Sequence, residues 1–330
     1  MIASLNRRSL LSGLVMASGS AILAGSAGPL LGAARRGGGT RKFFERTGKS
    51  IGLQLYTLGD EPGKDLDGVF AKLAQIGYRD LELPNLLGRK PAELRAAADK
   101  AGVSFSSVHL AASNRALPSS LLLNSDKQFI ADTLGTLGIH QAVVPMVPLP
   151  EKMDRQAGDT FQTMIARAMA AAGADIWKTT AAMLNERASA LKPYGITLGY
   201  HNHNIEFAPI GQTTGWEILA AETDPSLVKF EVDLGWIAAA GLDPVAFLKQ
   251  HSGRVQWIHV KDVKPATVTN FALNMVPAEV GAGKLDWARI LPTALAAGVQ
   301  HFYVEQEPPF AIPRMESVAK SYAYLAALRA

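Results

Sequence analysis

Apolar and polar residues alternate along the chain in a pattern that predicts strands and helices in turn. From Ile51 to the C-terminus, each short apolar run is followed by a longer amphipathic stretch. Short runs of this kind are typical of buried parallel strands, and the longer stretches are typical of the helices that cover them. We predict strands at residues 51–57, 79–83, 103–110, 141–147, 196–202, 228–234, 255–260 and 301–305.

Proline near the start of a stretch and glycine after its end mark several of the helices. We predict helices at residues 64–76, 91–101, 125–137, 160–192, 215–222, 244–250, 287–297 and 315–328. The loop at 261–282 before the seventh helix is long, and long ordered loops are commonly functional.

Eight strand–helix units with mostly short connections favour a closed (β/α)8 TIM barrel of the α/β class, as a single domain at 49–330. An open doubly wound sheet would carry a glycine-rich phosphate loop after its first strand. Residues 56–61 read Tyr-Thr-Leu-Gly-Asp-Glu, which lacks that pattern.

The N-terminus predicts export. Asn6-Arg7-Arg8-Ser9-Leu10-Leu11 precedes a weakly apolar run rich in Gly, Ala and Ser, as in twin-arginine signals. We predict a signal at 1–34, a flexible lead-in at 35–48 and a periplasmic protein without stable membrane association after signal removal. An uncleaved membrane anchor is the alternative, and the serines and glycines of the run argue against it.

Charge and cysteine content exclude several classes of function. The formal charge of +4 equals the contribution of the four arginines within residues 1–36, so the remainder is neutral and gives no argument for nucleic-acid binding. The chain has no cysteine, which excludes disulfides, thiolate nucleophiles and Cys-ligated zinc. The sequence leaves a homo-oligomer open.

Metal-binding residue types stand at the ends of the last three predicted strands. Alternation places Asp233, His259 and Glu305 on the inner face of adjacent strands, where a barrel of this kind has its active site. Such ligands suit Mn²⁺, our first choice, or Zn²⁺, Co²⁺, Fe²⁺ or Mg²⁺, better than Ca²⁺. The fourth ligand must come from the fifth strand or its loop. His201, His203 and Glu206 are the choices, and we favour Glu206.

Several segments resemble the xylose isomerase-like TIM barrel superfamily, the sugar phosphate isomerase/epimerase group. That group includes ketose epimerases, inosose dehydratases and, more distantly, endonuclease IV. The resemblance covers residues 48–330 and implies one divalent metal on Asp233, His259 and Glu305. The segments that carry it are YHNHN-EF (200–207), IHVKD (258–262), EVGAG (279–283) with Asp286, and VEQE (304–307).

The fifth strand departs from the family's pattern. Ketose epimerases end this strand in a glutamate, whereas here it ends in His201. The departure favours the branch that handles inososes and keto-sugars over a plain ketose 3-epimerase.

The chemistry follows from these groups. A Lewis-acidic cation polarises a carbonyl, and a base removes the proton on the neighbouring carbon. Our candidates for proton transfer are Lys261, His203 and Glu305. A neighbouring cation would lower the pKa of Lys261, and an ion pair of Lys261 with Asp262 or Glu279 is the alternative.

We therefore predict a metal-dependent sugar isomerase or epimerase whose substrate is a non-phosphorylated sugar or keto-sugar. The alternatives are a lyase or hydratase acting on a 3-keto-glycoside or inosose, and a non-catalytic periplasmic sugar-binding protein. A DNA repair nuclease is discounted, because it would need further histidine ligands and a basic groove. The side chains predicted to contact the sugar are Gln54, Tyr56, Glu82, His109, His201, Trp236 and Glu279.

Overall fold

The structure is a computed structural model that describes residues 41–330 except 113–120, 151–152 and 154. In this part of the chain, eight parallel strands hydrogen-bond into a closed barrel. They are β1 (Gly52–Gln54), β2 (Asp80–Leu83), β3 (Ser104–His109), β4 (Gln141–Val144), β5 (Thr197–His201), β8 (Val228–Asp233), β9 (Val255–Val260) and β12 (His301–Val304). Around the barrel their order is β1-β12-β9-β8-β5-β4-β3-β2. The predicted (β/α)8 barrel is confirmed, and every strand lies within its predicted range.

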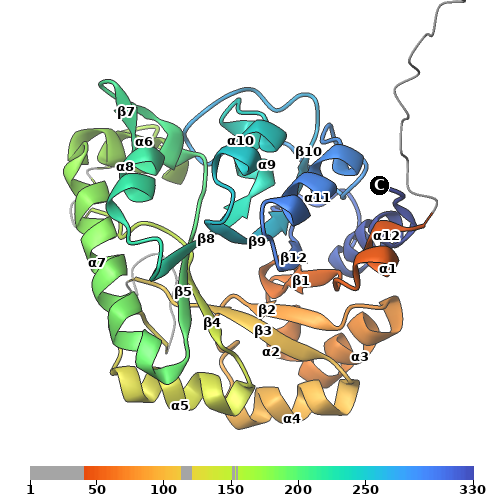
Figure 1. The fold of residues 1–330 in the computed structure, drawn as a ribbon. Helices are drawn as coiled ribbons and strands as arrows, with labels where there is room; N and C mark the ends of the chain where they lie inside the picture. Colours follow the sequence, from red (N-terminus) through yellow and green to blue (C-terminus); the bar gives the residue numbers. More distant parts are fainter. Residues whose placement is uncertain (1–40, 113–120, 151–152, 154) are drawn as a thin grey trace, which may run out of the picture. The chain divides into compact units, whose positions relative to one another are not determined.

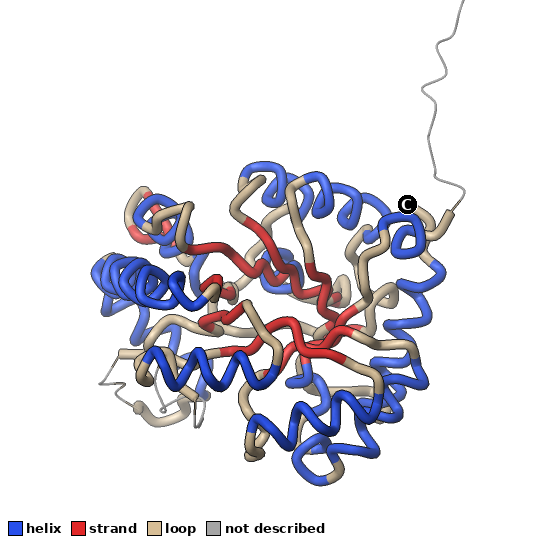
Figure 2. The backbone as a smooth tube through the Cα atoms, turned by 60° about the horizontal axis from the view of Figure 1, so that its bottom comes forward, coloured by secondary structure: helices blue, strands red, loops and turns tan. Residues whose placement is uncertain are grey.

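The main helices surround the strands (Figures 1 and 2). They are α3 (Leu66–Ile76), α4 (Pro91–Ala101), α5 (Lys127–Leu137), α6 (Phe161–Ala172), α7 (Asp175–Leu191), α8 (Gly215–Glu222), α10 (Pro244–Gln250), α11 (Trp287–Ala296) and α12 (Arg314–Ala327). Their ends follow local chemistry. The Asp126 side chain accepts the first free N–H groups of α5, and Gly138 ends that helix at a φ of 75°. The single helix predicted at 160–192 is two helices, because Gly173 leaves the helical conformation between them.

Several short elements join this framework. They are α1 (Phe43–Thr47), η1 (Leu55–Leu58), α2 (Glu61–Lys64), η2 (Lys192–Tyr194), η3 (Ile205–Phe207), α9 (Leu234–Ala239), and the strand pairs β6 (Pro209–Ile210) with β7 (Thr213–Thr214) and β10 (Asp262–Val263) with β11 (Pro277–Ala278). The long loop at 261–282 thus contains a two-stranded sheet. None of the helices in the described residues combines the length and apolar character needed to cross a membrane.

The predicted lead-in at 35–48 needs a correction at its C-terminal end. Residues 43–47 form α1, where Phe43 and Phe44 are buried and pack edge-on against the ring of Phe302. Burial of two aromatic rings holds this segment on the domain. The predicted export signal at 1–34 lies outside the described residues.

The lower interior of the barrel is filled by an apolar plug, which we define as Val143, Trp257 and Tyr303. Two glycines make room for its rings. A Cβ on Gly52 would lie 2.7 Å from the Tyr303 ring, and one on Gly199 would lie 2.6 Å from the Trp257 ring. Because the plug closes this level, the polar side chains farther along the same strand faces gather at the C-terminal end of the barrel, where such folds carry their active sites.

Candidate metal centre

Four neighbouring strands bring metal-binding side chains together at the C-terminal end of the barrel. His201 and Asp233 are the last residues of β5 and β8, His259 is the register partner of Asp233 on β9, and Glu305 follows β12. All four side chains are buried, and each offers one ligand atom within 4.8 Å of the others. We call these four residues the ligand cluster. The predicted convergence of Asp233, His259 and Glu305 therefore holds in the structure.

The ligand cluster contains buried polar atoms that lack hydrogen-bond partners. Asp233 Oδ2, His259 Nδ1 and Glu305 Oε2 are all of this kind. His259 Nδ1 lies 2.7 Å from Glu305 Oε2 and 3.6 Å from Asp233 Oδ2, and His201 Nε2 lies 4.0 Å from Asp233 Oδ2. Ligands about 2.1 Å from one ion lie at most about 4.2 Å apart. The chain's own residues therefore fit a divalent cation at this point.

Lys261 lies directly beside the ligand cluster. Its Nζ is 2.7 Å from Asp233 Oδ2, 2.8 Å from Glu305 Oε2 and 3.0 Å from Glu307 Oε1. Burial lowers its pKa, but these three carboxylates outweigh burial and raise the pKa well above its ordinary value. In this structure Lys261 is thus a protonated partner of the ligand carboxylates.

One expectation about Lys261 needs correction. Its ion-pair partners are Asp233, Glu305 and Glu307 rather than Asp262 or Glu279. The Asp262 carboxylate instead accepts hydrogen bonds from Gly281 N–H and from the indole of Trp287. Asp262 therefore holds the loop that carries the EVGAG segment.

Glu206, our favoured fourth ligand, is not brought into the ligand cluster. The short η3 helix turns its carboxylate back, so that it accepts hydrogen bonds from Tyr200 Oη at 2.7 Å and from His203 N–H at 2.9 Å. Burial raises the pKa of Glu206 to about 7. His201 occupies the fourth place instead.

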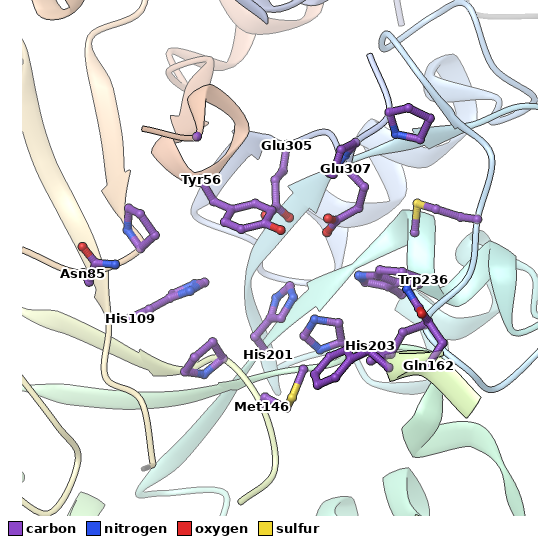
Figure 3. A pocket seen from close by; sticks show the side chains of 18 of the residues that line it. Tyr56, Asn85, His109, Met146, Gln162, His201, His203, Trp236, Glu305 and Glu307 are labelled. Atoms are coloured by element: carbon purple, nitrogen blue, oxygen red, sulfur yellow. The ribbon is translucent and has the colours of Figure 1, made fainter. Parts of the chain in front are cut away.

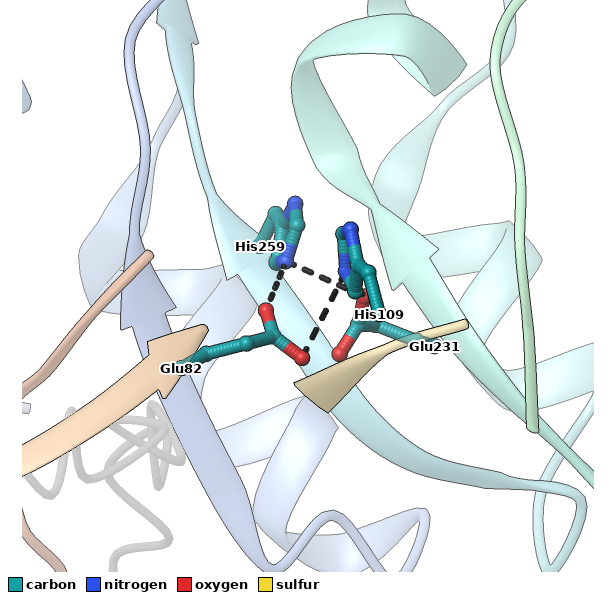
Figure 4. A group of neighbouring side chains, drawn as sticks. All are labelled: Glu82, His109, Glu231 and His259. Carbon is teal, nitrogen blue, oxygen red and sulfur yellow. Dashed lines mark hydrogen bonds and ion pairs between the residues drawn. The ribbon is translucent and has the colours of Figure 1, made fainter. Parts of the chain in front are cut away.

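A second group of titratable side chains lies one level deeper in the barrel, and Figure 4 shows its four members. We call Glu82, His109, Glu231 and His259 the lower polar cluster. Glu82 is fully partnered: it accepts from Ser107 Oγ at 2.6 Å and from Gln54 Nε2 at 2.9 Å, and its Oε2 lies 2.7 Å from His259 Nε2.

The carboxylates of the lower polar cluster favour the protonated form of His109. Burial lowers the pKa of His109, but Glu82 and Glu231 outweigh burial and raise it to about 9. Glu231 is a site residue that the sequence analysis did not select, although alternation along β8 places it on the same inner face as Asp233.

A pocket of about 950 Å³ opens above the ligand cluster (Figure 3). Of the predicted sugar-contacting residues, Gln54 and Glu82 lie beneath it, fully buried, and Glu279 is half-buried outside its lining. Glu307, which the sequence analysis did not select as a site residue, lines it too. The predicted residues that do line the pocket are Tyr56, His109, His201, His203, Trp236 and Glu305.

Groups that can carry protons lie on two sides of this pocket. Figure 3 shows Glu305 and Glu307 on one side, and His201 and His203 on the other. Burial and the charge of Lys261 lower the pKa of His203 to about 3, so its ring is neutral. A neutral imidazole can accept a proton, and a protonated lysine can donate one.

Known proteins resemble this chain in sequence and in fold. The family model described as xylose isomerase-like TIM barrel matches residues 70–328. An inosose dehydratase from Geobacillus kaustophilus is 25% identical over 205 residues, which make up 60% of this chain and 62% of that relative. The chain thus matches less than two thirds of the relative's length.

Solved structures share the fold. A sugar phosphate isomerase/epimerase from Parabacteroides distasonis aligns with a TM-score of 0.65 and 26% identity, covering 85% of this chain and 94% of the other. The IOLI protein, whose crystal structure contains a zinc atom, aligns with a TM-score of 0.53 and 15% identity, covering 84% and 98%. The family match extends over most of the barrel and includes every residue of both clusters. This chain belongs to the xylose isomerase-like TIM barrel family.

Proposed function

We propose that the protein is a divalent-metal-dependent isomerase or epimerase of a non-phosphorylated sugar or keto-sugar. The observation that carries the proposal is the ligand cluster itself: carboxylate and imidazole atoms that lack hydrogen-bond partners converge beneath a pocket. When bound there, a divalent cation supplies Lewis acidity toward a sugar carbonyl. The zinc in the IOLI protein supports a divalent ion, and Mn²⁺ remains our first choice.

The chain's own residues would move the proton. His203, which lies at the pocket wall with its Nδ1 lacking a hydrogen-bond partner in the described part of the chain, would accept the proton from the carbon next to the carbonyl. Lys261, held protonated by Asp233 and Glu305, would supply a proton. Removal on one face and return on the other is epimerisation, and return at the neighbouring carbon is isomerisation.

The pocket lining favours a substrate without phosphate. Among the described residues that line it, none is lysine or arginine, whereas Asp60, Glu305 and Glu307 are acidic. A phosphate group would meet like charges here and no guanidinium fork.

A lyase or hydratase is the second candidate, and the inosose dehydratase relative favours it. The same base would remove the proton, and a leaving group on the next carbon would depart in place of reprotonation. Incubating the metal-loaded protein with inososes and 3-keto-sugars in deuterated water separates the two. Deuterium exchange without loss of water or aglycone supports the isomerase, and stoichiometric release of either supports the lyase.

A non-catalytic sugar-binding protein would bind sugars equally well without metal, so full affinity after chelation would contradict both enzymes. Export to the periplasm stays a prediction. Replacing Arg7 and Arg8 by lysine should retain the protein in the cytoplasm, which cell fractionation would detect.

A further inference from the structure

Glu231 occupies an unusual place among the imidazoles of the barrel. Its side chain is fully buried, and its Oε1 lies 3.1 Å from His259 Nε2, 3.2 Å from His201 Nδ1 and 3.3 Å from His109 Nε2. One carboxylate oxygen thus faces nitrogens from three rings that come from three different strands.

Two of those rings belong to the ligand cluster, and each points its other nitrogen toward the candidate cation. The second nitrogen of His259, Nδ1, faces Glu305 and Asp233, and that of His201, Nε2, faces Asp233. A histidine ligand must be deprotonated at the nitrogen that binds the metal, and its other N–H needs an acceptor that fixes tautomer and ring orientation.

We propose that Glu231 is the positioning residue that sets the tautomer and orientation of both histidine ligands. The inference rests on the metal site of the proposed function. His201 Nδ1 has no hydrogen-bond partner among the described residues, so the carboxylate of Glu231 acts on it through its charge at 3.2 Å, which favours the proton on that nitrogen. The same charge helps to favour the proton of His259 on Nε2, which leaves His201 Nε2 and His259 Nδ1 free for the cation.

The two histidines depend on Glu231 to different degrees. His259 Nε2 also has Glu82 Oε2 at 2.7 Å. For His201 Nδ1, Glu231 is the carboxylate at ion-pair distance among the described residues. Loss of the Glu231 charge should therefore disturb His201 more than His259.

The test compares Glu231→Gln with Glu206→Gln in the full-length protein. Both carboxylates are buried near β5, but Glu206 contacts Tyr200 and the His203 backbone rather than a ligand ring. Affinities for Mn²⁺ and Co²⁺ are measured by competition with a chelator, and the visible spectrum of the Co²⁺ form reports the ligand geometry. Circular dichroism confirms that each variant is folded.

We expect Glu231→Gln to weaken metal binding by about 10- to 100-fold and to change the cobalt spectrum. Glu206→Gln should change neither. Wild-type affinity and spectrum in Glu231→Gln would overturn the inference while leaving the metal site intact. Failure of the wild-type protein to bind either ion would overturn the proposed metal site as well.

A separate observation concerns the walls of the pocket. Tyr56 and Phe161 are large apolar side chains with exposed fractions of 40% and 51%, and both line this pocket. Further apolar residues from the loops beyond the strands also line it: Leu87, Met146, Leu273, Met275, Pro308 and Pro309. The polar floor is thus continuous with apolar walls.

We infer that these walls bind an apolar substituent carried by the sugar, so that the substrate class is a glycoside of a keto-sugar. A volume of about 950 Å³ is near the upper end of the range for drug-sized ligands, and a single sugar ring is much smaller. This inference also rests on the proposed function, because it assumes that the sugar itself lies over the ligand cluster.

Calorimetry of the metal-loaded protein with phenyl and methyl glucosides tests this inference. We expect the phenyl glucoside to bind about 5- to 10-fold more tightly, and Phe161→Ala to remove most of that preference. Phe129→Ala is the matched control, since Phe129 is 48% exposed on α5 and does not line the pocket. Equal binding of the two glucosides by wild type would overturn the glycoside inference alone. Binding of neither would contradict the proposed sugar site too.

Discussion

Glu82 and Glu305 are both carboxylates inside the same barrel, yet their surroundings differ. Glu82 lies in the lower polar cluster, where Ser107, Gln54 and His259 contact both of its oxygens. Glu305 lies in the ligand cluster, where its Oε2 is buried without a hydrogen bond and approaches Lys261 and His259 only as an ion-pair partner.

The difference distinguishes buried polar side chains that stabilise the barrel from those that can bind a ligand. Buried polar groups are normally satisfied within the chain, and a group left unsatisfied costs stability. Such unsatisfied groups are found mainly at functional sites, where a bound ion or ligand satisfies them. Both carboxylates of the ligand cluster have an oxygen without a hydrogen-bond partner among the described residues, whereas in the lower polar cluster only Glu231 has one. We therefore take the ligand cluster as the functional level, which the lower polar cluster and the apolar plug support.

The largest expected effect is at the ligand cluster. Asp233→Asn and Glu305→Gln each remove a charged oxygen that the cation needs, so turnover of the identified sugar should fall by at least about 100-fold. Steady-state kinetics with saturating Mn²⁺ checks this result. Near-normal turnover in both variants, with the barrel folded, would defeat the site assignment.

A change in the apolar plug should act on stability alone. Trp257 is fully buried and its indole donates to Gln141 Oε1 at 2.5 Å. Trp257→Ala should lower the free energy of unfolding by about 3–5 kcal/mol, as measured by urea denaturation. The folded fraction should keep the wild-type number of bound metal ions. Loss of metal from the folded variant would contradict the view that the apolar plug affects stability but not metal binding.

The fourth ligand can be identified by one pair of variants. His201→Ala should weaken Mn²⁺ binding by about 10- to 100-fold, because it removes an imidazole from the ligand cluster. Glu206→Gln should leave that affinity unchanged, because Glu206 faces Tyr200 and His203. The reverse ranking in a chelator competition would restore Glu206 as the ligand.

The smallest effect is a pH dependence at Glu206. Burial raises its pKa from 4.5 to about 7, so the fold favours the protonated carboxyl. Its contribution to stability is complete below pH 4.5 and is lost as the pH rises through about 7. Glu206→Gln stays neutral, so relative to wild type it should gain about 1–2 kcal/mol of unfolding free energy between pH 5 and 8. A difference that does not change with pH would contradict this interpretation.

The sequence was informative where periodicity decides the outcome. Alternation along β8 and β9 placed Asp233 and His259 on the inner face, and the strand ends placed Glu305 beside them. The same rule could have selected Glu231. It was missed because a residue two positions before the strand end carries no signal of contact with rings from other strands.

Other features depend on backbone turns and long-range contacts that periodicity does not encode. Glu206 follows a short η3 turn that directs it back to Tyr200. Lys261 meets the carboxylates of Asp233, Glu305 and Glu307 rather than that of its neighbour Asp262. The burial of α1 depends on Phe302, which is far away in the sequence.

The central claim is that one divalent ion is held by the ligand cluster. Elemental analysis of the purified wild-type protein and of His259→Ala, after equilibration with Mn²⁺ and removal of free ion, tests it most directly. The account predicts about one ion per chain in wild type and almost none in the folded variant, since His259 bridges both levels of the site. Equal metal content in the two proteins would contradict it.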